Sequence, residues 1–476
     1  MSVSPETPSA TSISRRTLLQ RSAVAGALAI PAVGLLDACA GSSGGSKSGT
    51  STTTAAKSAD NPFGVVDGST VKVVVFDGGL GTDYAKKDVT IFNAKHPKVT
   101  VAQSATQKIK TQEQPKMATT PSDLINNSGA DIMDTSTLIN QQAILPLDDL
   151  LDAPTWDGTG TIRDSLLPGT IDTGTYSGKF YTLKYAFTVW GMWYDAALFD
   201  KNSWTVPKTW DDFFALAPKI KTAGIAPFVY DGVHGYYPRW HIMSTVWNAA
   251  GKQAVLDIDN LKPDAWKADG ILAGLQNIEK LVKDKLILAG SSALNHTQSQ
   301  QAHLDHKAAF IQLGTWYKNE MAKTLPPAFK LTLSNYWDVT GAKAAGAVYA
   351  AAGEDWVVPA KAANPAGAKE YLRAMLSSEA AADFASLTSS LASVKGSGDK
   401  VTDATLVSAN ALMKAAPADL INFRFPDFYA DYDKESQNLS EDLMAGRVDA
   451  AGFVTKMQAI ADKIAGDSSI KKQTHS

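Results

Sequence analysis

The chain has 476 residues, of which 44% are hydrophobic and 20% are charged, and its formal net charge at pH 7 is −3. This length exceeds the ~250–300 residues at which a single hydrophobic core usually stops growing, so two lobes are expected. The nearly balanced charge shows no basic stripe of the kind that nucleic-acid binding requires, and a lone cysteine excludes an internal disulfide.

The N-terminal segment has the parts of an export signal. Arg15 and Arg16 form a basic region, an apolar run follows from Ala23 to Leu36, and Cys39 comes shortly after it. The apolar run is too short to cross a bilayer core of ~30 Å as a helix. We therefore predict a twin-arginine lipoprotein signal peptide over residues 1–38 and lipidation of Cys39, which would anchor the protein to the outer face of the cell membrane.

A flexible tether is predicted after the signal. Residues 39–62 consist mostly of glycine, serine, threonine, alanine and lysine, a composition that cannot bury apolar surface.

The first folded part alternates strands and helices. The β-branched run 71–76 predicts a buried strand that ends in a glycine turn. A helix is predicted from Thr82, its N-cap, to about Lys95. A second strand at 99–101, a helix near 112–117 and a third strand at 130–134 continue the pattern. This alternation predicts an α/β lobe with parallel strands.

The aromatic run 181–194 is extended and too long for one ordinary strand, so we expect it to pass from one lobe to the other. Thr209 is predicted to cap a helix that begins at Trp210. Further helices are predicted at 237–250, 264–285, 297–307, 367–377, 379–386, 403–415, 433–445 and 450–465. Further strands are predicted at 308–312, 345–351 and 355–358.

No motif for catalysis stands out. The glycines of 78–81 lack both the dinucleotide-binding spacing and the lysine of a phosphate loop. His303 and His306, with His296 nearby, lack a third ligand at motif spacing and are predicted to be exposed helical histidines. No facing pair of carboxylates is apparent for glycoside hydrolysis. The sequence therefore predicts no enzyme activity, no metal and no cofactor.

Aromatic and polar residues instead occur together where lobe junctions are expected. An aromatic ring can stack on the apolar face of a pyranose, while amides and carboxylates bind its hydroxyl groups. Trp316 is the best-placed ring, because a strand there runs through Gly314 into a helix, and such strand ends open into clefts in α/β lobes.

In this order, the features resemble an extracellular solute-binding protein of an ABC-type sugar importer. The resemblance runs nearly end to end and is carried by 71–81, 193–195, 208–213, and 307–311 leading to 314–316. More narrowly, the chain resembles the N-acetylglucosamine and diacetylchitobiose binders of actinobacteria. That narrower resemblance is carried by 61–65, 127–131, 224–228, 296–300, 351–354 and 388–391.

The resemblance implies a two-lobed α/β fold of the periplasmic-binding-protein type, with discontinuous domains and a central ligand cleft. Lobe one would comprise 63–186 and 352–390, and lobe two 187–351 and 391–476. The chain would cross between the lobes near 183–189, 349–353 and 388–393. The implied ligand-binding residues are Trp316, Asp77, Gly78, Asn127, Trp190, Tyr237, Trp240, Glu354 and Trp356.

The implied function is capture of N-acetylglucosamine or N,N'-diacetylchitobiose by hinge closure, followed by delivery to a membrane permease. The protein would act as a monomer without a cofactor and without a nucleic-acid partner. Three alternatives remain: a binder of another oligosaccharide, a lipid-anchored sugar sensor, and a carbohydrate-active enzyme.

Overall fold

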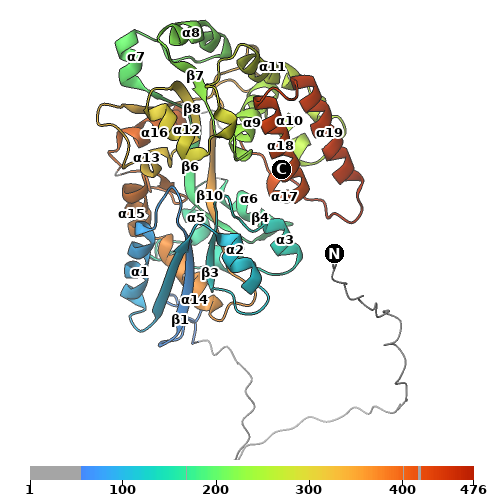
Figure 1. The fold of residues 1–476 in the computed structure, drawn as a ribbon. Coiled ribbons are helices and arrows are strands. Elements are labelled where there is room, and N and C mark those ends of the chain that lie inside the picture. The colour runs from blue at the N-terminus through green and yellow to red at the C-terminus, as the bar shows by residue number, and fades with distance from the viewer. Residues whose placement is uncertain (1–54, 168, 400, 416–419, 476) are drawn as a thin grey trace, which may run out of the picture. The chain divides into compact units, whose positions relative to one another are not determined.

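The structure is a computed structural model that describes residues 55–475 except 168, 400 and 416–419 (Figure 1). The predicted signal peptide, Cys39 and most of the predicted tether lie outside the described residues. Within the described part, no helix combines the length and apolar character needed to cross a membrane.

One mixed sheet runs through the described region. Its strands are β1 (Thr70–Phe76), β2 (Thr100–Thr106), β3 (Leu124–Asn127), β6 (Leu183–Asp195), β7 (Ala226–Val229), β8 (Ala308–Gly314), β9 (Leu331–Ser334), β10 (Tyr349–Val357) and β11 (Leu391–Ala392). The order is β2-β1-β3-β10-β6-β8-β7, with β9 and β11 also paired to β6. Strands β4 (Thr175–Tyr176) and β5 (Lys179–Phe180) form a separate hairpin.

The sheet has two parallel parts joined by an antiparallel pair. Strand β1 lies parallel to β2 and β3, and β7 lies parallel to β8, whereas β6 and β10 are antiparallel to each other. In Figure 1, β6 and β10 continue from the part that holds β1 and β3 to the part that holds β7 and β8. The aromatic run predicted to pass between lobes is thus one strand of 13 residues.

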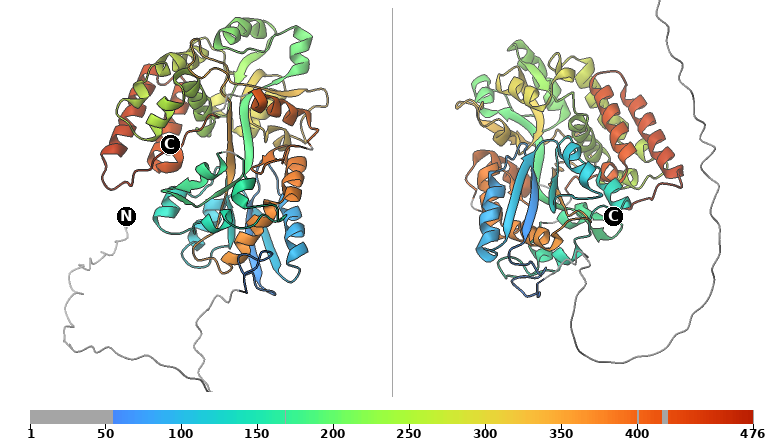
Figure 2. Two further views of the ribbon diagram at one scale, coloured as in Figure 1. Left: turned by 180° about the vertical axis from the view of Figure 1, so that it is seen from behind. Right: turned by 60° about the horizontal axis from the view of Figure 1, so that its bottom comes forward.

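The helices cover both ends of the sheet. The longer ones are α1 (Asp83–Lys95), α8 (Trp210–Thr222), α9 (Tyr236–Ala250), α10 (Lys252–Asp259), α11 (Ile271–Lys283), α12 (His296–Leu304), α14 (Pro365–Met375), α15 (Ser378–Thr388), α16 (Ala404–Ala415), α18 (Ala430–Met444) and α19 (Ala450–Gly466). Helices α14 and α15 pack beside α1 (Figure 2), and α11 and α18 pack against α9.

The shorter helices lie in the connections. They are α2 (Ile109–Glu113), α3 (Thr135–Asn140), α4 (Asp148–Leu151), α5 (Ile162–Ser165), α6 (Thr170–Gly174), α7 (Ala196–Asn202), α13 (Tyr317–Glu320) and α17 (Phe425–Phe428). Single 3-10 turns occur at η1 (Gln114–Lys116), η2 (Ala265–Lys267) and η3 (Ser291–Ala293).

The described residues form one compact unit that contains two large hydrophobic cores. The first core is built from residues 63–186 together with 356–394. The second core is built from 190–349 and 421–464, with Tyr176 as its one contributor from the earlier segment. The chain changes from one core to the other within β6 and β10, so the discontinuous organisation follows from these two strands.

The predicted helix start at Thr209 is confirmed in atomic detail. The Thr209 hydroxyl accepts a hydrogen bond from Asp212 N at 3.0 Å, and Asp212 Oδ2 accepts one from Thr209 N at 3.1 Å. This reciprocal capping satisfies two of the N–H groups that a helix start leaves without partners.

Four predicted elements differ from the structure. The strand predicted at 130–134 is wrong, because the strand here is β3 at Leu124–Asn127. The chain turns at Gly129 (φ +89°), and the Asp131 carboxylate then accepts a hydrogen bond from Thr111 N of α2 at 3.0 Å. The two strands predicted at 345–351 and 355–358 are the single strand β10. The helix predicted from 264 begins at Ile271, because Asp264 and Gly270 have positive φ.

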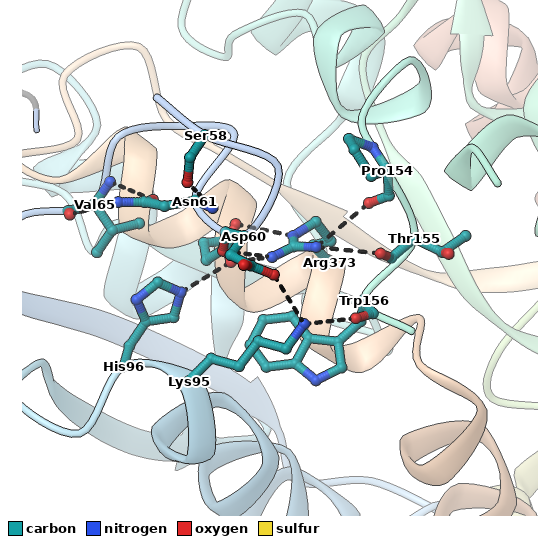
Figure 3. A network of polar contacts seen from close by, with 11 residues as sticks. Ser58, Asp60, Asn61, Val65, Lys95, His96, Pro154, Thr155, Trp156 and Arg373 are labelled. Carbon is teal, nitrogen blue, oxygen red and sulfur yellow. Dashed lines mark hydrogen bonds and ion pairs between the residues drawn. The ribbon is translucent and has the colours of Figure 1, made fainter. Parts of the chain in front are cut away.

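Arg373 fixes the start of the described chain to the first core (Figure 3). Its guanidinium donates to Glu370 Oε2 at 3.0 Å and to the carbonyl oxygens of Asp60 at 3.0 Å and Thr155 at 3.2 Å. His96 Nε2 lies 2.9 Å from the other Glu370 oxygen. The Arg373 and Glu370 side chains are 1% and 0% exposed, so their charges depend on each other and on these partners.

We predict that Arg373→Met lowers the free energy of unfolding by about 3–5 kcal/mol, because it leaves the Glu370 carboxylate buried without its partner. Urea denaturation followed by circular dichroism measures the change. The control is Arg163→Met, which breaks an exposed pair with Asp152 and should cost less than about 1 kcal/mol. Equal effects of the two substitutions would contradict this account of Arg373.

Candidate functional site

Four aromatic side chains meet where the sheet passes from the first core to the second. Trp316 follows β8, Trp190 lies on β6, and Tyr237 and Trp240 lie three residues apart on α9, which places them on one helix face. The ring centroid of Trp316 is 5.9 Å from that of Trp190, 5.8 Å from Trp240 and 6.4 Å from Tyr237. We call these four residues the aromatic cluster.

Two glycines make room for Trp316. A Cβ atom at Gly314 would lie 1.9 Å from Trp316 Cζ3, so only glycine lets the indole lie back across the end of β8. A Cβ atom at Gly79 would lie 3.2 Å from Trp316 Cδ1. Asn319 Nδ2 also donates to Gly79 O at 2.5 Å. The loop after β1, which belongs to the first core, therefore lies directly against Trp316 and the start of α13.

Trp190 supports the cluster from within the sheet. It pairs with Tyr349 across the β6–β10 ladder, and the two rings stack with centroids 4.4 Å apart and planes 17° apart. Trp190 is 6% exposed, whereas Trp316 and Trp240 keep part of their surface accessible. Trp190 Nε1 is buried and has no hydrogen-bond partner within the described part of the chain.

Glu354 is the acidic residue of the predicted site whose pKa is shifted from its ordinary value. It lies on β10 with φ +59°, a conformation that costs free energy for a residue with a side chain and that is often found at binding sites. Burial raises the pKa of its carboxyl to about 7, although hydrogen bonds with Ser128 and Asn126 act in the opposite direction. Glu354 is therefore an acid that gains or loses its proton near neutral pH.

An ion-pair network links the two cores beside Glu354. Lys184 on β6 lies 3.1 Å from Asp355 on β10 and 3.9 Å from Asp427 on α17. Arg424 Nε donates to Asp427 at 2.9 Å, and the Ser136 hydroxyl at the start of α3 donates to the Asp427 carbonyl. Burial opposes the charge of Lys184, but the two carboxylates hold its pKa above its usual range.

The structure places the remaining predicted residues differently. Asp77 is exposed, and Gly78 lies against the ring of Phe76, where a Cβ atom would be 2.1 Å from Phe76 Cε1. Asn127 is fully buried: its Nδ2 donates to Met133 O at 2.8 Å and its Oδ1 accepts from Met133 N at 2.9 Å. Trp356 is 0% exposed within the first core.

The Asn127 amide is thus occupied by Met133, and Trp356 is enclosed in the first core, so neither side chain is open to a ligand in this structure. The neighbouring Asn126 is also buried, and its side chain lies beside that of Glu354. Its Oδ1 accepts from Phe76 N at 3.1 Å, and its Nδ2 donates to Ser128 Oγ at 3.0 Å. In a strand, adjacent residues face opposite sides, so the sequence pair does not reveal which asparagine faces Glu354.

The prediction that His303 and His306 are exposed helical histidines is wrong. His303 is 1% exposed, its Nδ1 lies 2.7 Å from the Tyr317 hydroxyl, and burial lowers its pKa to about 3. His306 lies beyond the end of α12 with φ +55°, and its Nε2 is 2.8 Å from Asp195 Oδ2. Both side chains have structural partners, because α12 packs against β8 rather than lying free on the surface.

Comparison with solved structures establishes the fold. The chain superposes with a TM-score of 0.69 on a protein from a study of xylan utilization by the thermophilic bacterium Caldanaerobius polysaccharolyticus, at 18% identity, covering 82% of this chain and 99% of that one. It superposes with a TM-score of 0.65 on a chitin oligosaccharide binding protein, also at 18% identity, covering 82% and 98%. The predicted two-lobed α/β fold is therefore confirmed.

Sequence comparison identifies the family. The chain is 35% identical over 471 residues to the diacetylchitobiose binding protein NgcE of Streptomyces coelicolor, which covers 97% of this chain and 98% of that protein. Residues 78–382 match the family of bacterial extracellular solute-binding proteins. The chain therefore belongs to the bacterial extracellular solute-binding protein family.

Proposed function

We propose that the protein captures N,N'-diacetylchitobiose or N-acetylglucosamine between its two lobes and delivers the sugar to an ABC permease. The end-to-end similarity to a diacetylchitobiose binding protein supports this ligand class. The protein would act as a monomer that binds its ligand without transforming it. Binding of another oligosaccharide is the alternative that the titrations below distinguish.

The position of Trp316 carries this proposal. The indole lies between the loop after β1 and the rings of Trp190 and Trp240, so both cores border it. These two rings and that of Tyr237 are inclined to its plane by 61° to 76°, and none of the described aromatic rings stacks parallel on Trp316. A face of the indole can therefore serve as the platform for a pyranose ring.

Polar groups for a ligand would come from the proposed lobe one. We propose that Glu354 and Asp77 bind ligand hydroxyl or amide groups, with Gly78 allowing close approach of the backbone. We exclude Asn127 and Trp356 from the proposed site, because the Asn127 amide is bonded to Met133 and Trp356 is enclosed in the first core. Tyr237, Trp240 and Trp190 would shape the apolar wall.

Binding would close the lobes about the strands that join them. We propose lobe one as 63–186 and 352–390, and lobe two as 187–351 and 391–476. The three proposed crossings lie side by side, since Phe187 of β6 pairs with Ala352 on β10 and with Leu391 on β11. Rotation about these segments would separate Gly79 from Trp316 and Asn319, and closure would restore their contact around the sugar.

Delivery would occur at a membrane. We propose that the chain is exported by the twin-arginine route and lipidated at Cys39, and that residues 39–62 act as the tether. Such a tether raises the effective concentration of the binding protein at its permease without any additional contact.

We predict that Trp316→Ala weakens binding of N,N'-diacetylchitobiose by at least about 30-fold, which corresponds to about 2 kcal/mol for loss of an aromatic contact at the centre of a site. Isothermal titration calorimetry measures the affinity, with N-acetylglucosamine, maltose and cellobiose titrated in parallel. Because Trp316 is only partly buried, the variant should remain folded.

The matched control is Trp204→Ala, which removes another partly buried tryptophan, one that packs on Phe199 away from the aromatic cluster. Its sugar affinity should equal that of the parent protein. An unchanged affinity of Trp316→Ala would remove this residue from the site, and failure of both N-acetylated sugars to bind would overturn the proposed ligand.

We predict that Glu354 makes stability fall with rising pH. Its pKa is about 7 in the folded protein against 4.5 ordinarily, so between these values the folded state retains a proton that the unfolded state releases. The free energy of unfolding should therefore fall by about 1–3 kcal/mol between pH 4.5 and pH 8. Glu354→Gln should remove that loss, so it is more stable than the parent at pH 8 and equal near pH 4.

Thermal unfolding of both proteins across this pH range measures the difference. Glu435→Gln, which neutralises an exposed acid on α18, is the control and should follow the parent curve. If the unfolding temperatures of Glu354→Gln and the parent changed with pH in the same way, the raised pKa of Glu354 would be contradicted.

A further inference from the structure

Three side chains of types that can bind a metal ion lie together beside the aromatic cluster. Asp231 and His234 come from the loop between β7 and α9, and His296 is the first residue of α12. One potential ligand atom from each residue lies within 4.8 Å of the others. The three residues are separated by up to 65 positions in the chain, so the fold rather than a local motif brings them together.

Asp231 and His234 are already held in place. The Asp231 carboxylate is buried, and its Oδ1 accepts hydrogen bonds from Val233 N at 2.8 Å and His234 N at 3.0 Å. Its Oδ2 lies 2.7 Å from His234 Nδ1. The loop thus positions one carboxylate oxygen and one imidazole without help from a ligand.

His296 has the hydrogen-bond pattern of a metal-binding histidine. Its Nε2 lies 3.2 Å from Glu320 Oε1, and the other Glu320 oxygen accepts from Gln300 Nε2 at 2.6 Å. Its Nδ1 is buried and has no hydrogen-bond partner among the residues that the structure describes. Metal-ligating histidines usually donate one ring N–H to a carboxylate, which leaves the other nitrogen for the metal.

We propose that Asp231, His234 and His296 form a Zn²⁺ site, with Glu320 orienting His296. Two imidazole nitrogens and one carboxylate oxygen are a ligand set that zinc prefers, and a tetrahedral ion would keep its fourth position for water. Bond lengths of ~2.0–2.2 Å bring the ligand atoms to roughly 3.4 Å from one another, so the side chains must adjust by about 1 Å. The proton between His234 and Asp231 is released as the ion binds.

The site adjoins the sugar platform through Tyr237. The Tyr237 ring centroid lies 6.4 Å from those of His234, His296 and Trp316, and its plane is 9° from that of His296. An ion at this place would fix the start of α9 and with it the position of Tyr237 in the aromatic cluster. This coupling rests on the proposed function, whereas the zinc site itself does not.

Zinc binding is tested without sugar. The chelator-treated protein is titrated with ZnCl₂ in a calorimeter at about pH 7.5, where an ordinary imidazole is mostly neutral. We expect one ion per chain. His296→Ala and His234→Ala should each weaken binding by at least about 100-fold, and Glu320→Gln by about 10-fold, as for loss of an orienting partner. Co²⁺ in place of Zn²⁺ should give visible absorption bands typical of a four-coordinate ion.

His306→Ala is the matched control, because it removes a partly exposed imidazole whose partner, Asp195, is outside the proposed site. Its zinc affinity should equal that of the parent. The proposal is overturned if the parent binds no stoichiometric zinc, or if His296→Ala and His306→Ala bind it equally well. A zinc titration that fails while the sugar titration succeeds would refute the metal site alone.

Discussion

The antiparallel pairing of β6 with β10 is the constraint on which the rest of the structure depends. Both strands contribute side chains to both cores, and their register sets Trp190 opposite Tyr349 and Lys184 opposite Asp355. If one of these strands shifted by one residue against the other, its side chains would turn to the opposite faces of the sheet and these pairs would separate. The stacked rings of Trp190 and Tyr349 and the ion pair of Lys184 with Asp355 are therefore fixed by the same backbone hydrogen bonds.

The contacts between the two cores differ in kind from the packing inside each core. Near the proposed site they include the Asn319–Gly79 hydrogen bond and the ion pair of Lys184 with Asp427. Water can replace such polar partners at a net free-energy cost of only about 1 kcal/mol per hydrogen bond, whereas opening an apolar core exposes large hydrophobic surface. Separating these polar contacts therefore costs less free energy than opening either core.

Features that depend only on neighbouring residues, such as helix caps and strand ends, could be predicted from the sequence. Thr209 identified a capped helix, and the passage of β8 through Gly314 placed Trp316 where a strand opens toward the other lobe. Local signals could not show whether Asn127 faces a ligand, because this depends on the register of β3, which neighbouring strands determine.

The histidines show that the sequence also does not reveal which residues far apart in the chain come together in the fold. Spacing along the chain directed attention to His303 and His306, which the fold separates into different structural roles. The grouping of His296 with Asp231 and His234 depends on how α12 and the loop before α9 pack, and no periodicity in the sequence records that packing.

A crystal structure of the protein with N,N'-diacetylchitobiose tests the central claim most directly. We expect one pyranose ring stacked on Trp316, with the loop after β1 and Glu354 contacting its polar groups and β6 and β10 intact. A sugar bound elsewhere, with Trp316 still covered by Gly79 and making no contact with the ligand, would contradict the account.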